Sequence, residues 1–350
     1  MWRIYFLFQL FCFLSGHADC ETKPHPLGEP VSVLGPTIIE KSKNKPEDDA
    51  DVIKKAIDGK VYAPIAQLIG ERTLAQRLAI NIAYGKLAKE NISDSINNAL
   101  FNSKHDGSER RFYNGFFLQL PVYLANCFYD SMNNWIDWVH LSIVCTSSVT
   151  RLTALRKGYL DAFGVEITKD IDKFDAGKDV LNVMLDPKTM RPDSGTDDKL
   201  LDSQVALIPD STDKCNSNDL LNFMASTSFD QIRNVSNKWI AKNKNADIVD
   251  NFRENCERGY RQEAYKRIVR FARDPYQYFS EEFKLGYELD SRNSRAHEYL
   301  VISRSEIDLK DIIKRYNDQY SADIIKEVKG NADKNAYQAL LAAVLVGNAG

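Results

Sequence analysis

The sequence predicts an all-α protein built from four copies of one helical unit. Three observations support this prediction. Helix-start signals recur at near-constant spacing, apolar residues follow each signal at helical spacing, and alternating β-branched runs are scarce. The start signals lie 75, 80 and 77 positions apart, at Thr73, Ser148, Ser228 and Ser305. Self-similarity at a fixed long period is typical of repeat architectures.

Each signal resembles a capping box, in which a Ser or Thr and a polar residue three positions later satisfy free N–H groups at a helix start. The later residue is Gln76 in the first unit, Gln231 in the third and Asp308 in the fourth. Arg151 replaces the acceptor in the second unit. We therefore expect helices to begin at the four signals.

The helices after the signals share an apolar stripe. Residues four positions apart lie on one helix face, so such a stripe indicates packing against a core. The residues seven positions after each signal are Ile80, Leu155, Val235 and Ile312. Those eleven positions after it are Tyr84, Tyr159, Trp239 and Tyr316. A third set follows about eight positions later and comprises Ile92, Ile167, Ile248 and Ile324.

Other segments complete each unit or connect the units. Residues 46–57, "PEDDADVIKKAI", begin with Pro and acids, which suit the first turn of a helix. Residues 121–132 and 275–289 open with Pro in the same way. Residues 186–199, "DPKTMRPDSGTDDK", predict a linker, and the polar, Pro-rich residues 22–45 predict a loosely ordered tail.

The N-terminus has the three parts of a secretory signal. Arg3 precedes the apolar run "IYFLFQLFCFL", and the small residues "GHA" follow at positions 16–18. The run is too short to span a bilayer, which needs about 20 apolar residues. We expect residues 1–18 to be removed and the protein to be secreted, with an uncleaved N-terminal anchor as the alternative. Asn91 and Asn234 begin glycosylation sequons.

Composition narrows the functional classes. The chain has 350 residues, of which 43% are hydrophobic and 27% charged, as in a soluble globular protein. A net charge of -3 argues against nucleic-acid binding. The cysteines after the signal show no CxxC spacing, which argues against structural zinc, and one or two disulfides remain possible. These cysteines are Cys20, Cys127, Cys145, Cys215 and Cys256.

No pattern indicates an enzyme. The histidines are isolated, and the chain has no Gly-rich phosphate loop. Glu306 and Asp308 look like paired carboxylates, but capping and the helix dipole account for both.

Four units of about 70 residues with a central linker resemble the annexin family. The segments that carry the resemblance best are "VISRSEIDLKDIIKRYNDQYSADIIKEVKG" at 301–330 and "ERTLAQRLAINIAYGKL" at 71–87. The resemblance implies four five-helix repeats in a curved disc that docks on anionic phospholipid through calcium. It divides the chain into a tail (19–45), two repeats (46–118 and 119–186), a linker (187–199) and two further repeats (200–272 and 273–348).

The family's calcium loop, M-K-G-x-G-T, lies between the first two helices of a repeat, and a carboxylate about 40 residues later completes the shell of six to eight oxygens. Glycine permits the tight curl that lets backbone carbonyls converge. In the first repeat the loop is "IDGKVY", where Gly59 remains and Val61 replaces the second glycine. The resemblance implies carbonyl ligands from Ile57, Gly59 and Val61, with Asp106 as the candidate carboxylate.

The other three loops lack glycine, at 131–138, 210–215 and 288–295. We therefore expect calcium binding to be weak and confined to the first repeat. Cations and a Trp in or beside the loops could contact lipid instead, and the alternative is a solvated rim. These residues are Lys60, Trp135, Lys214, Arg292 and Arg295, while Trp138 is expected in the core.

Two hypotheses follow. The first is a secreted annexin-like protein that binds phospholipid peripherally. The second is a secreted interaction or effector protein that keeps the scaffold, has lost calcium-dependent lipid binding and engages a protein partner.

Overall fold

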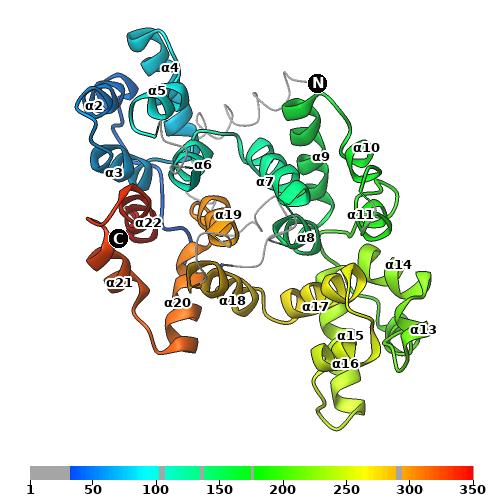
Figure 1. The fold of residues 1–350 in the computed structure, drawn as a ribbon. Helices are drawn as coiled ribbons and strands as arrows, with labels where there is room; N and C mark the ends of the chain where they lie inside the picture. Colours follow the sequence, from blue (N-terminus) through cyan, green and yellow to red (C-terminus); the bar gives the residue numbers. More distant parts are fainter. Residues whose placement is uncertain (1–31, 102–106, 135–137, 175–176, 289–293, 350) are drawn as a thin grey trace, which may run out of the picture.

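The computed structural model describes residues 32–101, 107–134, 138–174, 177–288 and 294–349. Regular structure in these ranges is entirely helical, so the all-α prediction is confirmed. The helices gather into four groups around a centre (Figure 1). The predicted signal, Asp106, Trp135 and Arg292 lie outside the described residues.

Each group contains five helices in chain order, which we name positions A to E. Repeat 1 comprises α2 (Pro46–Asp58), α3 (Ala63–Glu71), α4 (Leu74–Ala88), α5 (Ile92–Ala99) and α6 (Gly107–Gly115). Repeat 2 comprises α7 (Leu120–Asn134), α8 (Val139–Cys145), α9 (Val149–Phe163), α10 (Ile167–Ile171) and α11 (Lys178–Met184).

Repeat 3 departs from the others in its first part. Helix A is the short α12 (Leu201–Val205), which follows the 3-10 turn η1 (Asp198–Leu200), and the extra turn α13 (Thr212–Cys215) lies in its AB loop. Positions B to E are α14 (Asn218–Ser226), α15 (Phe229–Lys242), α16 (Ile248–Asn255) and α17 (Tyr260–Arg273). Repeat 4 comprises α18 (Pro275–Glu288), α19 (Ser294–Arg304), α20 (Leu309–Tyr320), α21 (Ile324–Asn331) and α22 (Ala336–Val346).

The predicted apolar stripe is confirmed. All twelve stripe residues are buried, with exposed fractions between 0% and 9%. The isoleucines of the third set are each the first residue of a D helix, and each is 0% exposed. One isoleucine per repeat therefore fixes the start of the D helix against the core.

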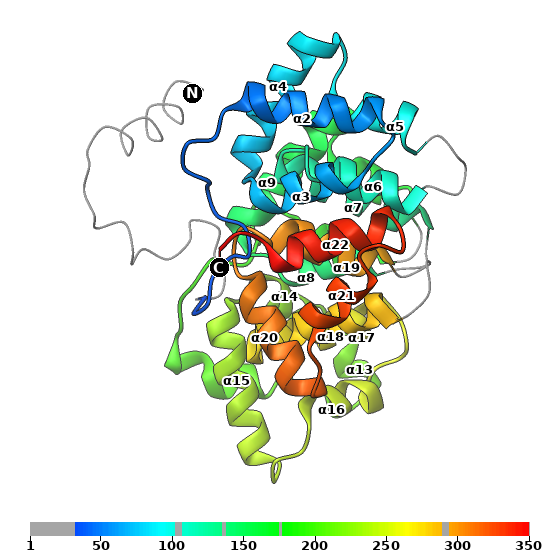
Figure 2. The ribbon, with the colours of Figure 1, turned by 90° about the vertical axis from the view of Figure 1, so that its left-hand side faces the viewer.

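Seen from its edge, the disc has two different faces (Figure 2). Helix α2 ends, and helix α22 begins, at the face opposite the C-terminus. The AB and DE loops of repeat 1 and repeat 4 therefore open on one side, which we call the loop face.

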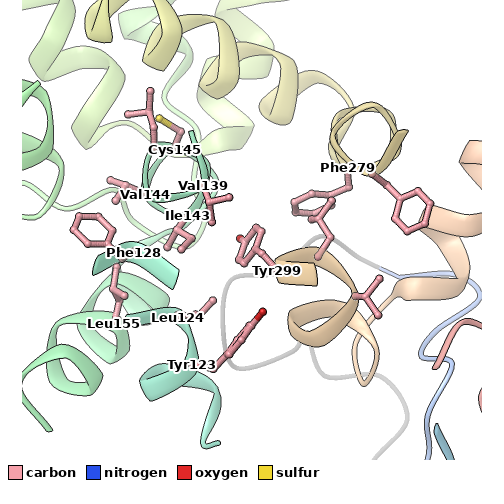
Figure 3. Packing of buried hydrophobic residues seen from close by; sticks show 14 of the residues in the cluster. Tyr123, Leu124, Phe128, Val139, Ile143, Val144, Cys145, Leu155, Phe279 and Tyr299 are labelled. Atoms are coloured by element: carbon pink, nitrogen blue, oxygen red, sulfur yellow. The ribbon is translucent and has the colours of Figure 1, made fainter. Parts of the chain in front are cut away.

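Close packing joins the repeats. In repeat 1, α3 lies against α22 of repeat 4, and a Cβ on Gly70 would come within 2.4 Å of the carbonyl oxygen of Ala343. Glycine is required there because the two backbones nearly touch. At the centre, Tyr123 of α7 and Tyr299 of α19 lie across the space between these helices (Figure 3).

The predicted helix start at Ser305 is wrong. Helix α19 ends at Arg304, and α20 begins only at Leu309. Asp308 forms an ion pair with Arg304 in which both side chains are 0% exposed, so its carboxylate is not free to cap α20. The polar pattern in this segment serves a buried ion pair, which sequence spacing alone does not distinguish from a cap.

Glu306 contacts the start of helix α4 in repeat 1, whereas the sequence placed it in the first turn of a helix of repeat 4. Its carboxylate accepts hydrogen bonds from the backbone N–H of Leu74 at 2.7 Å and from Arg77 at 2.8 Å. Leu74 is the first residue of α4, so a residue of repeat 4 caps a helix of repeat 1.

The other start signals differ in how much of the box they form. Thr73 and Gln76 form both bonds of the capping box. Ser228 accepts from the N–H of Gln231 at 3.1 Å, but the Gln231 side chain binds the backbone of the linker. Ser148 makes no cap bond with its own helix.

The tail is more ordered than expected from residue 32 onward. The backbone N–H groups of Thr37 and Ile38 donate to the carbonyl of Ser305, both at 3.0 Å. Asp311 accepts the N–H groups of Val33, Leu34 and Gly35 at 3.1–3.2 Å. Residues 32–45, which we call the N-terminal strap, are therefore fastened to repeat 4.

Candidate functional site

Helix α2 ends at the AB loop of repeat 1, where two N–H groups of the loop donate hydrogen bonds back to carbonyls of the last helical turn. The N–H of Lys60 donates to the carbonyl of Ile57 at 3.0 Å, and the N–H of Val61 donates to that of Ala56 at 2.8 Å. This pair of bonds is the Schellman motif, which places a left-handed residue just after the helix. That residue is Lys60, with φ of +54°, whereas Gly59 keeps a helical φ of -80°.

This geometry bears on the three predicted calcium ligands. The loop curls tightly although Val61 replaces a glycine, because the left-handed residue is Lys60. The carbonyl of Ile57 already accepts a hydrogen bond, while Gly59 and Val61 are exposed. The carboxylate that would complete the site, Asp106, lies outside the described residues. The ligand set of Ile57, Gly59, Val61 and Asp106 stays a prediction.

The loop borders an open hollow of about 620 Å³ between α3 and α22. Lys60 and Val61 line it from repeat 1, and Asp333, in the DE loop, lines it from repeat 4. The hollow brings a cation and a carboxylate of different repeats to the edge of the loop face.

The AB loop of repeat 3 is fastened to the DE loop by a covalent bond. Cys215, at the end of α13, forms a disulfide with Cys256, the C-cap of α16, and the two positions are 41 residues apart. Both half-cystines are buried. The disulfide therefore links the two segments from which the family resemblance predicts calcium ligands.

An arginine side chain donates hydrogen bonds to carbonyl oxygens of this same loop. The Arg261 guanidinium, in the first turn of α17, donates to the carbonyls of Asn216 and Ser217. Its Nε donates to Asp179 of repeat 2 at 2.9 Å. A metal ion at this loop would have to displace a guanidinium that already satisfies these oxygens.

The predicted lipid-contacting cations differ in their environment. Lys60 is exposed and forms no ion pair in the described part of the chain. Lys214 is neutralised in part by Asp210 at 2.7 Å. Arg295 lies in the first turn of α19 and lines a pocket with α6 and α7. The structure therefore separates these three residues, and only Lys60 stands at an open loop.

Exposed apolar side chains occur beside three AB loops, which the sequence reading largely missed. Val61 is 48% exposed in repeat 1, and Leu285, in the last turn of α18, is 49% exposed in repeat 4. Trp138, the residue before α8, is 38% exposed, so its expected place in the core is wrong. Its ring stacks against His140 and contacts Tyr260 instead.

Repeats 2 and 4 each bury a histidine at the same position of helix B. The His140 Nδ1 and the Ser131 hydroxyl share a hydrogen bond of 2.8 Å. The His297 Nε2 and the Tyr337 hydroxyl share one of 2.5 Å. Burial lowers the pKa of His140 to about 3 and that of His297 to about 4. Both rings are therefore neutral at physiological pH and serve packing.

The two sequons lie in different settings. Asn91 is exposed and caps α5, accepting from the N–H of Asp94 at 2.8 Å. Asn234 lies within helix α15, and the serine of its sequon, Ser236, is 1% exposed. Asn91 is the more accessible candidate for glycosylation.

The described residues contain neither a clustered metal site nor a helix that could span a membrane. No group of three or more His, Cys, Asp or Glu side chains in these ranges is placed to hold a metal ion. Within the same ranges, every helix is too short or too polar to cross a bilayer.

Known proteins resemble this chain in sequence and in fold, although no family model matches it. Annexin-like protein RJ4 from Fragaria ananassa is 22% identical over 313 residues, covering 85% of this chain and 95% of that protein. Annexin A10 from Mus musculus is 30% identical over 114 residues, covering 33% of this chain and 32% of that protein.

Solved structures share the whole architecture. Annexin III superposes with a TM-score of 0.78 at 20% identity, covering 91% of this chain and all of that one. Calcium-bound annexin (Sm)1 superposes with a TM-score of 0.71 at 19% identity, covering 93% and 97%. The fourfold helical repeat and these solved structures show that the chain has the annexin fold, and its sequence is similar to those of annexin-like proteins.

Proposed function

We propose that this protein binds anionic phospholipid membranes peripherally through its loop face, and that calcium contributes only at repeat 1. The observation that carries the proposal is the set of exposed apolar side chains beside the AB loops, namely Val61, Trp138 and Leu285. Side chains of this kind insert into the bilayer interface, where Trp is especially favoured. Lys60 adds a cation, worth about 1 kcal/mol beside anionic lipid.

The calcium part of the proposal rests on the contrast between loops. At repeat 1 the residues Gly59 and Val61 are exposed at a tight turn, as a calcium loop requires. At repeat 3 the disulfide and Arg261 occupy the equivalent segments. We therefore infer that repeat 3 does not bind calcium.

Secretion through the signal at 1–18 is part of the proposal. The Cys215–Cys256 disulfide supports it, because disulfides persist in oxidising compartments such as the extracellular space. N-terminal sequencing of the mature protein tests it, with Asp19 expected as the first residue.

Sedimentation with phosphatidylserine vesicles tests membrane binding. We expect partial pelleting in a chelator, through Lys60 and the apolar side chains, and increased pelleting in calcium. Leu285→Asp is expected to reduce pelleting in both conditions. Ile82→Asp is the matched control, since Ile82 is 65% exposed but lies on α4. Equal loss in both variants, or no pelleting of the native protein, would contradict the proposal.

Asp106→Ala tests the calcium site itself. The variant is expected to abolish the calcium-dependent increase and to leave pelleting in chelator unchanged. An unchanged calcium midpoint would remove Asp106 from the ligand set.

A protein partner is the alternative function. The closed loop of repeat 3 favours it, because one of the four family docking loops is no longer open to a metal ion. Failure to pellet with or without calcium would leave this alternative.

A further inference from the structure

We propose that a pocket between α6, α7 and α19 binds a small anionic amphiphile, a molecule with one acidic head and a short apolar body. The pocket has a volume of about 410 Å³ and is formed by repeats 1, 2 and 4 together. Small-molecule sites commonly span about 300–1,000 Å³. The pocket is separate from the AB loops used above, and its occupancy does not depend on membrane binding.

Three arginines line the pocket. Arg110 and Arg111 lie in the first turn of α6, and Arg295 lies in the first turn of α19. All three arginines are partly exposed, so solvent and a ligand can reach them. Convergent arginines suit carboxylate and phosphate groups, which accept their N–H donors in pairs.

The arginine charge is only partly neutralised by the protein. Arg111 reaches Glu298 at 3.5 Å, a long contact, and its Nε is buried with no hydrogen-bond partner. Arg110 makes no ion pair or hydrogen bond through its side chain to any described residue. Asp130 and Glu298 are the acidic residues among the described lining of the pocket. An anionic head would satisfy the donor on Arg111 and the charge on Arg110.

Apolar side chains form much of the remaining lining, beside the polar Asn114 and Asn126. Leu118, Tyr123, Val139 and Phe163 line it, and Tyr123 is visible extending from α7 towards α19 (Figure 3). A bare inorganic anion would leave these apolar side chains uncovered. The combination of arginines and apolar side chains in one pocket therefore suits an amphiphile.

Calorimetric titration in chelator, without vesicles, tests the proposal with dodecanoate as the probe. We expect saturable binding of one dodecanoate per chain and no comparable binding of dodecyltrimethylammonium, which has the same tail and the opposite charge. The absence of vesicles and calcium keeps this result independent of the proposed membrane function.

Variants locate the binding. Arg110→Gln combined with Arg111→Gln is expected to weaken dodecanoate binding about tenfold, the effect of one lost charge-assisted hydrogen bond. Leu118→Trp, which fills the pocket, is expected to abolish binding. Arg233→Gln, in a separate polar groove on α15, is the matched control and should bind normally.

Three results would overturn the proposal. They are the absence of saturable dodecanoate binding, equal binding of the two surfactants, and unchanged affinity in the double arginine variant. Circular dichroism of each variant confirms that its helices are retained, so that lost affinity reports on the pocket.

Discussion

Repeats 1 and 3 occupy opposite corners of the disc (Figure 1) and hold their AB and DE loops by different chemistry. In repeat 1 the AB loop is an open turn with an exposed Val61 and an unpaired Lys60 among the described residues. In repeat 3 the disulfide and the Arg261 contacts close the equivalent loop.

The difference extends to the end of helix B. Repeat 1 uses its own Arg72, which forms a bidentate ion pair with Asp49 at 2.7 and 2.9 Å. Repeat 3 has Thr227 at that position, and Arg191 of the linker donates to the carbonyls of Thr227 and Met224 instead. The same scaffold therefore stabilises the end of helix B in two ways. Repeat 1 uses an ion pair of its own, and repeat 3, whose AB loop is closed, uses contacts from the linker and a disulfide.

The largest expected effect comes from opening the disulfide. A bond closing a loop of 41 residues contributes about 4 kcal/mol through the entropy of the unfolded chain. Cys215→Ser should lose stability of this size in urea unfolding, while Cys127→Ser, which removes a half-buried thiol outside the disulfide, should change it little. Equal stability of the oxidised and reduced native protein would show that repeat 3 does not rely on the bond.

Asp49→Ala breaks the corresponding anchor of repeat 1. It leaves the buried Arg72 charge with Glu71 alone, at 3.3 Å, which costs about 3 kcal/mol. Asp58→Ala is the control, because the Lys54–Asp58 pair is exposed and such pairs contribute less than about 1 kcal/mol. Similar losses in the two variants would mean that burial of the Asp49–Arg72 pair is unimportant.

Acid should affect a different pair of repeats, since the described histidines belong to repeats 2 and 4. Their folded pKa values lie near 3 and 4, below the ordinary 6.5, so the unfolded chain binds protons first as pH falls. Each histidine should therefore cost about 1.4 kcal/mol of stability per pH unit below 6.5. Denaturant unfolding from pH 7 to 5 measures this slope. His140→Asn should make it shallower, and an unchanged slope would exclude His140 as a source.

The smallest effect is expected from restoring glycine at repeat 1. Val61→Gly should lower the calcium midpoint for vesicle pelleting, because a glycine gives the loop carbonyls more freedom to converge. Asn216→Gly in repeat 3 should leave the midpoint unchanged while Arg261 holds the loop. A lower midpoint in the second variant alone would reverse the assignment of calcium to repeat 1.

Sequence spacing predicted the architecture well because burial is periodic. The stripe residues and the isoleucines that open the D helices depend only on which face of each helix meets the core. The capping signal at Ser305 failed because Asp308 pairs with Arg304, and a buried ion pair uses the same residue types as a helix cap.

The candidate site was less accessible to sequence reasoning. Loss of glycine at the AB loops was visible, but the pairing of Cys215 with Cys256 was one of several possible, and the contact of Arg261 with the AB loop joins residues 45 positions apart. Exposure of Trp138 depends on how α8 meets α17, which no local pattern encodes.

The N-terminal strap makes the two ends of the folded chain depend on each other. The Thr37 carbonyl accepts hydrogen bonds from the backbone N–H groups of Asn348 and Ala349 at 3.0 and 3.1 Å. The Asn348 side chain accepts a hydrogen bond from the backbone N–H of Ile39 and donates one to the Ile39 carbonyl. A protease that trims the chain before Ser32 leaves this clasp whole. A cut between Gly35 and Ile39 would release the last residues after α22 and loosen the seam between the first and last repeats.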